Sequence, residues 1–256
     1  MQEEPSPEPK ILFLLMGASN LARGYSLLTR HLSKCLGAGN SEFLNALGPG
    51  RGFCARGGMF NFTYPPIQDC RVMEAAEKKT KHTRAVLITD IGNDLMYGVT
   101  ADVLIECLDT LIDRMLQWEA EIFLTSIHVD MKKDVSPATF FILRFIFYPA
   151  SKVTYEETDS FIVKVNSYLE EKTRKNEKVH LITGMESYAG SDKIHYSLLK
   201  THQAWSQVIE EILRVLNIPE KNTPRLIDGV ISILANLKRL IFCDIFRWTK
   251  KGRDFF

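Results

Sequence analysis

The stretch ILFLLMGASNLARGYSLLTR, residues 11–30, sets a pattern that the rest of the chain repeats. Six apolar residues from Ile11 to Met16 end at Gly17, and apolar residues at three- and four-residue spacing follow Ser19. An unbroken apolar run is typical of a strand buried on both faces, whereas the later spacing is typical of an amphipathic helix. The stretch therefore predicts a buried strand, a glycine turn and a helix that begins close to Ser19.

Four further apolar runs, each bounded by glycine or turn residues, continue this pattern. They are EFLNALG (42–48), RAVLITDIG (84–92), AEIFLTSIHVD (120–130) and KVHLITG (178–184). Helical spacing of apolar residues occurs in the segments 21–36, 101–118, 158–175 and 198–216. Strands that alternate with helices predict an α/β fold, a three-layer α/β/α sandwich with a central parallel sheet of about five strands, of the flavodoxin-like type.

The composition indicates which kind of protein this is and which partners it is not expected to bind. The chain has 256 residues, of which 45% are hydrophobic and 25% charged, enough for one large domain with a substantial core. A net charge of +1 gives no general attraction to polyanions, so we expect no nucleic-acid partner. The five cysteines are scattered and form no C-x-x-C pair, so we expect no metal site and no disulfide framework.

The N-terminal end carries no recognisable targeting signal. The first nine residues are acidic and Pro-rich, and the apolar run 11–16 is too short for a signal peptide or a membrane span. We therefore expect a disordered tail over residues 1–9, a single domain over 10–218 and a cytoplasmic protein with reduced thiols.

Two segments depart from the strand–helix rhythm. SPATFFILRFIFYPA, residues 136–150, is aromatic-rich, and it is either a lid or acyl-pocket wall or a plain buried connection. In the last segment, 219–256, the residues from Pro224 have apolar side chains at helical spacing and seven Lys/Arg against three Asp. Such a basic amphipathic helix either makes peripheral contact with an anionic membrane or packs against its own domain, and both interpretations remain open.

Residues that carry chemistry follow three of the predicted strands. Ser19 follows the first strand, Asn93 the third, and Asp192 and His195 the fifth. The carboxyl ends of parallel strands gather at one edge of the sheet, which is where such folds bind ligands. A serine nucleophile needs a base to accept its proton and a carboxylate to orient that base, so Ser19, His195 and Asp192 form a candidate catalytic triad.

Donors for a developing oxyanion are also present. The turn after the second predicted strand, LGPGRG (47–52), offers glycines whose backbone N–H groups can approach a substrate closely. Asn93 offers a side-chain amide, and the backbone N–H of Ser19 lies at the start of a predicted helix.

The order of these motifs resembles that of the SGNH, or GDSL-type, hydrolases over roughly residues 10–216. The four matching stretches are GASN (17–20), NALGPGRG (45–52), GNDL (92–95) and DKIH (192–195). The resemblance implies a serine esterase without a cofactor, with Ser19 as nucleophile and with Ser19, Gly50 and Asn93 as oxyanion donors, Gly52 being the second choice for the glycine. Two departures stand out: Ala18 replaces an aspartate of the family pattern, and Gly92 directly precedes Asn93 where the pattern is G-x-N-D.

Ordinary structural roles are the alternative to these catalytic assignments. Ser19 alone is a normal helix N-cap, and Asn93 alone is a normal turn residue. Asp94 is expected to hold its loop through backbone amides. The candidate pocket residues are Asn20, Arg51, Gly52, Asp94 and His128.

The function predicted from these residues is hydrolysis of a small-molecule carboxylic ester, with a lipid, a carbohydrate or another small molecule as the esterified compound. A catalytically inactive binding module of the same fold, for a glycan or a lipid, is the alternative. The oligomeric state does not follow from the sequence.

Overall fold

The computed structural model describes residues 10–59, 62–80 and 82–246. Its centre is a parallel sheet of five strands in the order β2-β1-β5-β6-β7. The strands are β1 (Ile11–Met16), β2 (Ser41–Ala46), β5 (Thr83–Ile88), β6 (Glu121–Thr125) and β7 (Val179–Ile182). Each falls within or within one residue of a predicted apolar run, and the predicted fold class is confirmed.

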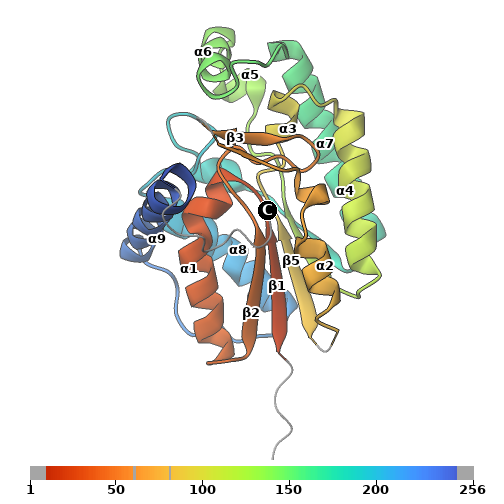
Figure 1. The fold of residues 1–256 in the computed structure, drawn as a ribbon, viewed down its shortest axis with the longest axis vertical. Coiled ribbons are helices and arrows are strands. Elements are labelled where there is room, and N and C mark those ends of the chain that lie inside the picture. Colours follow the sequence, from red (N-terminus) through yellow and green to blue (C-terminus); the bar gives the residue numbers. More distant parts are fainter. Residues whose placement is uncertain (1–9, 60–61, 81, 247–256) are drawn as a thin grey trace, which may run out of the picture.

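Helices cover both faces of this sheet (Figure 1). One layer holds α1 (Ser19–Leu36) and α8 (Thr201–Val215), and the other holds α2 (Val72–Glu77), α4 (Ala101–Leu116) and α7 (Tyr155–Lys175). Successive residues of β1 point to opposite layers, since Phe13 and Leu15 join the first cluster and Leu14 and Met16 the second. Burial on both faces explains why the strand reads as an unbroken apolar run.

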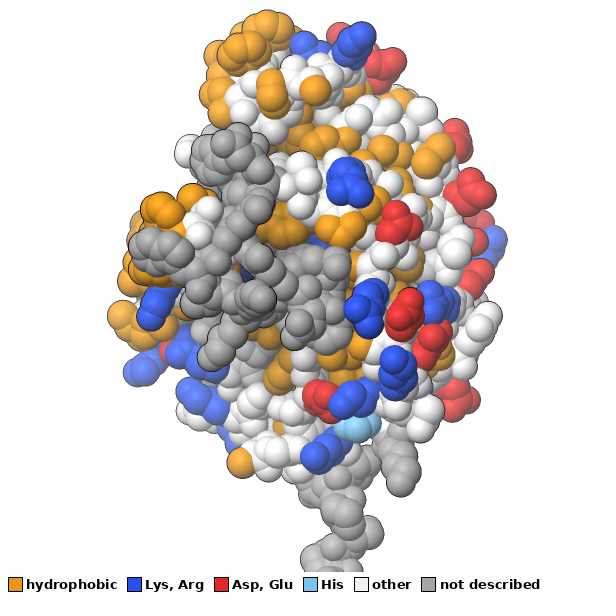
Figure 2. Space-filling model, in the orientation of Figure 1, with side chains coloured by type: hydrophobic (Ala, Val, Ile, Leu, Met, Phe, Trp, Pro, Cys, Tyr) orange, Lys and Arg blue, Asp and Glu red, His pale blue; other side chains and the backbone are white. Residues whose placement is uncertain are grey.

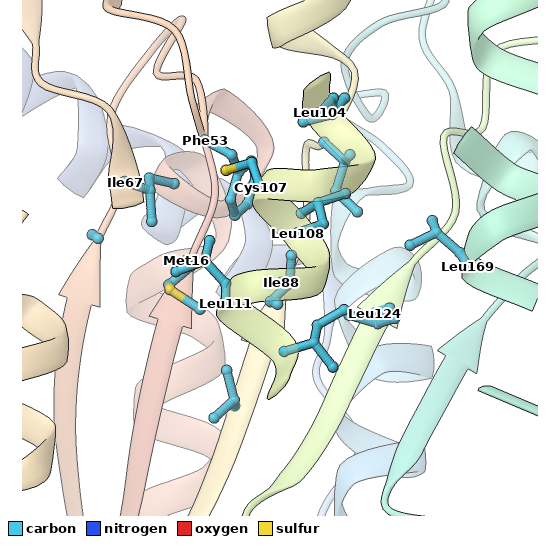
Figure 3. Close-up of a cluster of buried hydrophobic side chains, with 14 of the residues drawn as sticks. Met16, Phe53, Ile67, Ile88, Leu104, Cys107, Leu108, Leu111, Leu124 and Leu169 are labelled. Atoms are coloured by element: carbon cyan, nitrogen blue, oxygen red, sulfur yellow. The ribbon is translucent and has the colours of Figure 1, made fainter. Parts of the chain in front are cut away.

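Figure 3 shows the second of these clusters, between the sheet and α4. Met16, Ile88 and Leu124 come from three neighbouring strands and belong to the same buried group as Leu108 and Leu111 of α4. The parallel pairing of β1 with β5 places Met16 opposite Ile88, so the loops that follow the two strands begin next to each other.

The strand order places a crevice at the carboxyl ends of β1 and β5. From β1 the chain passes through α1 to β2 on one side, and it later enters β5 on the other side of β1. The two connections leave in opposite directions, which opens a crevice of the kind where doubly wound folds bind ligands. Ser19 follows β1 and Asn93 follows β5, so both lie at this crevice.

Short elements surround the crevice. They are the hairpin β3 (Gly57–Met59) and β4 (Phe62–Tyr64), the 3-10 turns η1 (Ile67–Asp69) and η2 (Met185–Tyr188), and the helices α3 (Asn93–Met96), α5 (Met131–Asp134) and α6 (Pro137–Phe147). Helix α6 forms most of the aromatic-rich segment 136–150. Phe140 and Tyr148 are buried, whereas the outer face of α6 exposes Phe141, Ile142, Phe145 and Ile146. The segment is therefore not a plain buried connection.

The C-terminal tail folds against the domain. Helix α9 (Leu226–Arg239) continues into the π-helical turn η3 (Leu240–Ile245), and α9 packs along α1. The Ser232 hydroxyl accepts a hydrogen bond from Leu27 N–H (3.1 Å) and donates one to Arg23 C=O (2.8 Å), so it bridges a pair of backbone groups within α1. Gly229 lies against Thr201, where a Cβ would come within 2.8 Å of the threonine methyl group. Packing against its own domain, one of the two predicted interpretations, therefore describes the inner face of α9.

The outer face of α9 is apolar and exposed. Figure 2 shows hydrophobic side chains gathered at the left of the molecule, over α9, and at the top, over α6. Those exposed on α9 include Ile227, Ile231, Leu234 and Leu237. Membrane contact through this face stays a prediction. The predicted disordered tail 1–9 and the basic residues from Arg247 onward lie outside the described residues, and within the described ones no helix is long and apolar enough to cross a membrane.

Candidate active site

Ser19 is the first residue of α1 and does not cap it. The N-cap position belongs to Ala18, and the Ser19 hydroxyl instead lies 2.9 Å from Nε2 of His195. The interpretation of Ser19 as an N-cap is therefore wrong. A helix start leaves backbone N–H groups that need other acceptors.

Those acceptors come from Asp90, a residue that the sequence analysis missed. Its Oδ2 accepts hydrogen bonds from the N–H groups of Ala18 (2.8 Å) and Leu21 (3.1 Å), and its Oδ1 accepts one from the Asn20 amide (2.9 Å). Asp90 follows β5 with a φ of 60°, a left-handed conformation that Asp tolerates better than most residues. Its position at the end of a buried strand was the available signal, but the motif TDIGND contains two aspartates and gives no reason to choose the first.

His195 and Asp192 lie in the loop between η2 and α8. The Nδ1 of His195 is 2.8 Å from Oδ2 of Asp192, whose Oδ1 also accepts hydrogen bonds from the N–H groups of Ile194 (3.1 Å) and His195 (2.9 Å). Burial opposes ionisation of Asp192, but the hydrogen bonds from the side chain and backbone of His195 outweigh it and lower the pKa of the carboxyl to about 2. A carboxylate that accepts a hydrogen bond from Nδ1–H keeps the imidazole hydrogen on that nitrogen, which leaves the lone pair of Nε2 directed at Ser19.

Asn20 fastens the start of α1 to the His195 loop. Its Nδ2 donates to Ile194 C=O (3.1 Å) as well as to Asp90, and its Oδ1 accepts from Tyr196 N–H (3.0 Å). The predicted pocket residue Asn20 is buried and borders the space beside Ser19. Asn20 therefore fixes the position of Ile194 and Tyr196, the two neighbours of His195, relative to Ser19.

Gly50 borders the same small cavity as Ser19 and His195. Its φ is +70°, and a Cβ would come within 2.6 Å of Gly58 C=O, so the position requires glycine. The hydroxyl of Tyr97 donates to Gly50 C=O (2.6 Å) and accepts from Gly58 N–H (3.1 Å), which fixes the peptide. In the part of the chain that the structure describes, no group accepts a hydrogen bond from the N–H of Gly50 or of Ser19.

Asn93 begins α3 and is held at both ends of its amide. Its Nδ2 donates to Arg51 C=O (3.1 Å), and its Oδ1 accepts from the hydroxyl of Tyr148 (2.8 Å). A carbonyl oxygen can only accept, so the contact with Arg51 determines which end of the amide is nitrogen. The second Nδ2 hydrogen has no acceptor among the described residues.

Tyr148, which follows α6, is a second residue that sequence reasoning did not single out. Its ring packs edge-on against that of Tyr97, with 5.0 Å between centroids, and burial raises the pKa of its hydroxyl, which therefore stays protonated and donates. Tyr97 thus holds Gly50 and Tyr148 holds Asn93, each through a hydrogen bond, and the two tyrosine rings contact each other.

Three predicted pocket residues lie outside the space around Ser19. Asp94 is fully buried and accepts hydrogen bonds from the N–H groups of Phe53 (2.6 Å), Cys54 (2.9 Å) and Ala55 (2.7 Å), as expected for a residue that holds its loop. Gly52 packs against this carboxylate. Arg51 is fully buried, with its guanidinium 5.7 Å from the centre of the Tyr64 ring. The interpretation of these three as pocket residues is therefore corrected, because the loop core encloses them.

Ser19 borders two cavities in the described part of the chain. The first, which we call the apolar cavity, encloses about 110 Å³ between the strand ends and helices α5, α6 and α7. Its walls include Leu95, Ile127, Val135, Phe140, Leu143 and Ile162. The second, which we call the histidine cavity, encloses about 40 Å³ and is bordered by Gly50, Asn93, Tyr97, Phe147 and His195.

His128, the last predicted pocket residue, lines the apolar cavity. Burial lowers the pKa of its imidazole, so the ring is neutral at physiological pH, and it packs against Tyr196 with 5.4 Å between ring centroids. The apolar cavity therefore receives no positive charge from His128.

Comparisons with solved structures give the same fold. The chain is similar to the aryl esterase of M. smegmatis (TM-score 0.53, 11% identity, 79% of this chain and 98% of that one). It is also similar to a carbohydrate acetylesterase family member from Sinorhizobium meliloti (0.53, 11%, 80% and 99%) and to the psychrotrophic esterase EstA from Pseudoalteromonas sp. (0.50, 14%, 80% and 98%). No protein-family model and no curated protein matches the sequence. The chain thus has the fold of the SGNH esterases, as its motifs predicted.

Proposed function

We propose that this protein is a serine esterase that hydrolyses a carboxylic ester through an acyl-enzyme. One observation carries the proposal: Ser19, His195 and Asp192 form a continuous hydrogen-bonded chain with separations of 2.9 and 2.8 Å at the crevice of the sheet. A serine, a base and an orienting carboxylate in this order form the arrangement that activates a hydroxyl nucleophile. The fold shared with several esterases makes ester hydrolysis the reaction class to test first.

In the first half of the reaction, Nε2 of His195 accepts the Ser19 proton while Oγ bonds to the ester carbonyl carbon. Asp192 stabilises the imidazolium that results. The tetrahedral intermediate then breaks its bond to the alkoxy oxygen, and His195 gives its proton to that leaving group. In the second half, water gives a proton to His195 and attacks the acyl carbonyl carbon, and the bond to Ser19 Oγ then breaks. The products are therefore an alcohol and a carboxylic acid.

The negative charge of the intermediate needs donors that nothing else occupies. The N–H groups of Ser19 and Gly50 and the second amide hydrogen of Asn93 lack acceptors within the described chain, and all three residues border the histidine cavity. Donors that are already in place stabilise the oxyanion without reorganisation. We assign them as the oxyanion hole, with Gly50 rather than Gly52 as its glycine.

A fluorophosphonate probe tests the proposal directly. EstA, one of the esterases that share this fold, was solved inhibited by monoethylphosphonate, which suggests this class of reagent. We expect labelling of the wild-type protein at Ser19, located by peptide mass spectrometry. Ser19→Ala should abolish labelling, His195→Ala should slow it strongly, and Ser19→Ala should lower kcat on p-nitrophenyl esters at least about a thousandfold. A well-folded wild-type protein that is neither labelled nor active would contradict the proposal and favour a binding module of the same fold.

A further inference from the structure

The two cavities at Ser19 differ in which catalytic group they contain. His195 borders the histidine cavity but does not line the apolar cavity, whereas Ser19, Asn93, Tyr148 and Ile194 border both. The reacting carbonyl carbon must lie at Ser19, so the two cavities lead away from it in different directions.

The position of His195 decides which part of an ester enters which cavity. The alkoxy oxygen receives its proton from Nε2 of His195, so the leaving group must lie on the histidine side. The acyl chain then extends from the carbonyl carbon into the apolar cavity. This step rests on the proposed function, because it takes His195 as the acid that protonates the leaving group.

The walls of the apolar cavity specify an uncharged chain. The threonine hydroxyls in its walls are engaged, since Thr125 donates to Thr89 (2.9 Å) and Thr158 donates to Thr154 C=O (2.8 Å). In the described part of the chain, the buried Nε2 of His128 has no hydrogen-bond partner. The Asp90 carboxylate, which also borders the cavity, accepts three hydrogen bonds from the start of α1. A negatively charged acyl group would be repelled by this carboxylate and would lose its water in a mainly apolar cavity whose described walls hold no cationic side chain, so the cavity disfavours it.

The cavity also limits the length of the chain. An apolar cavity of about 150 Å³ holds a benzene molecule. The volume here is about 110 Å³, about three quarters of that value, which suits the three to five carbons that follow the carbonyl in an acid of about four to six carbons.

We propose that the apolar cavity is the acyl subsite, and that the substrate is an ester of an uncharged aliphatic acid of about four to six carbons. The alcohol portion leaves past His195 and Phe147, whose rings lie 6.4 Å apart. Helix α6 supplies Phe140 and Leu143 to the wall, so the aromatic-rich segment 136–150 determines the acyl specificity together with Ile162 of α7.

A chain-length series measures this specificity. For the p-nitrophenyl esters of acetate, butyrate, hexanoate, octanoate and laurate, we expect kcat/KM to rise about fourfold per methylene until the cavity is filled and then to fall. The succinate monoester should be hydrolysed at least about tenfold more slowly than butyrate. A profile that is flat, or highest for acetate or laurate, would overturn the proposal.

Wall substitutions link the profile to this cavity. Ile162→Ala and Leu143→Ala enlarge the cavity and should move the optimum toward octanoate, whereas Ile162→Phe should move it toward acetate. Leu143 is only half-buried, so its truncation keeps the test available should Ile162→Ala fail to fold. Val163→Ala is the matched control, because Val163 is the next residue of α7 and is 60% exposed.

The possible outcomes separate the acyl subsite from the proposed function. Optima that move with Ile162 and Leu143 but not with Val163 support the subsite. Activity whose profile none of the wall variants changes would overturn it while leaving the esterase intact. Fluorophosphonate labelling of Ser19 without turnover of any ester in the series would also overturn the substrate class and keep the activated serine. A folded protein with neither labelling nor turnover would contradict both proposals.

Discussion

Asp90 supports Ser19, the proposed nucleophile, without contacting its hydroxyl. Its carboxylate accepts hydrogen bonds from two backbone N–H groups at the start of α1 and from the side-chain amide of Asn20. Asn20 in turn forms hydrogen bonds with the residues on either side of His195. The position of Ser19 relative to His195 therefore depends on one carboxylate. Removing a helix cap costs about 1 kcal/mol, and leaving buried donors unpaired costs more.

We expect Asp90→Asn to lower the free energy of unfolding by about 1–2 kcal/mol and to slow fluorophosphonate labelling about tenfold. Asn has nearly the same side-chain size as Asp and tolerates the left-handed backbone conformation. Its single acceptor oxygen, however, cannot accept hydrogen bonds from all three donors that Asp90 binds. Urea denaturation and labelling kinetics measure the two effects. Thr100→Ala removes the N-cap of α4 and should lower stability alone; an Asp90→Asn protein that reacts at the wild-type rate would show that the carboxylate does not position Ser19.

Tyr148 acts through Asn93, and its loss should appear in kcat. In Tyr148→Phe the ring still packs on Tyr97, but the Asn93 amide loses the hydrogen bond that holds its oxygen. Because the oxyanion exists only after attack on the carbonyl, we expect kcat to fall about tenfold with KM changed less than about twofold. Tyr168→Phe is the control, since its hydroxyl binds Asp109 away from the crevice and its loss should leave kcat unchanged. A rise in KM at constant kcat would instead indicate a role in substrate binding.

Among single residues, the sequence singled out those whose chemistry is distinctive. Ser19, His195, Asp192 and Asn93 could be chosen as candidates because each follows an apolar strand in a recognisable order, and the structure brings them together. Asp90, Tyr97 and Tyr148 could not, because their importance lies in partners that only the folded chain brings near. Arg51 and Gly52 were assigned to the pocket because they are close to Gly50 in sequence, although the loop folds inward around Asp94.

Among the secondary-structure elements, buried strands and amphipathic helices were the predictable part. All five strands of the parallel sheet and the helices α1, α4, α7 and α8 follow patterns that periodicity reveals. The hairpin β3–β4 was missed because three-residue strands in a glycine-rich turn carry no periodic signal. The segment 136–150 gave no clear period because α6 is apolar on its buried and exposed faces alike.

The outer face of α9 allows a test of membrane contact with little effect on the fold. Ile227 and Leu234 are 54% and 58% exposed and lie on a helix whose last turn carries Lys238 and Arg239. If this face binds anionic lipid, the wild-type protein should sediment with phosphatidylserine vesicles at low salt, and Ile227→Glu with Leu234→Glu should abolish sedimentation while esterase activity is retained. Val103→Glu, an exposed apolar site on α4, is the matched control. Equal sedimentation of all three proteins would contradict membrane contact through α9.

For the whole molecule, the strand order explains why residues so distant in sequence form one site. The crevice lies between β1 and β5, where the chain leaves the sheet in opposite directions, and the loop after β7 completes it. The parallel sheet could be predicted from strand–helix alternation, but its strand order was not predicted. The cavity beside Ser19 could not be predicted either, since helices α5 and α6, inserted between β6 and α7, build much of it.

Acid stability should reflect the Asp192–His195 pair. The pKa of Asp192 is lowered from 3.8 to about 2 in the folded protein, so its ionised form stabilises the fold above the unfolded value, and this stability is lost as the pH falls through the folded one. After allowance for partial exposure, we expect Asp192→Asn to be less stable by about 1 kcal/mol near neutral pH, with the difference vanishing between about pH 4 and pH 2. Urea denaturation across this range measures it. Ser19→Ala, which keeps the pair, should follow the wild-type curve, and a difference for Asp192→Asn that does not change with pH would refute the linkage.

The hydroxyl of Ser232 has a consequence for the timing of synthesis. It bridges Arg23 and Leu27 of α1 from 209 and 205 residues further along the chain, so α1 gains this contact only after α9 has been made. Ser19 and His195 are themselves 176 residues apart. A nascent chain whose α9 has not yet emerged from the ribosome lacks part of the support of α1, the helix that begins at Ser19, and contacts of such long range form slowly. We therefore expect the proposed hydrolytic activity to appear only after α9 has emerged, so that a shorter growing polypeptide stays inert toward esters.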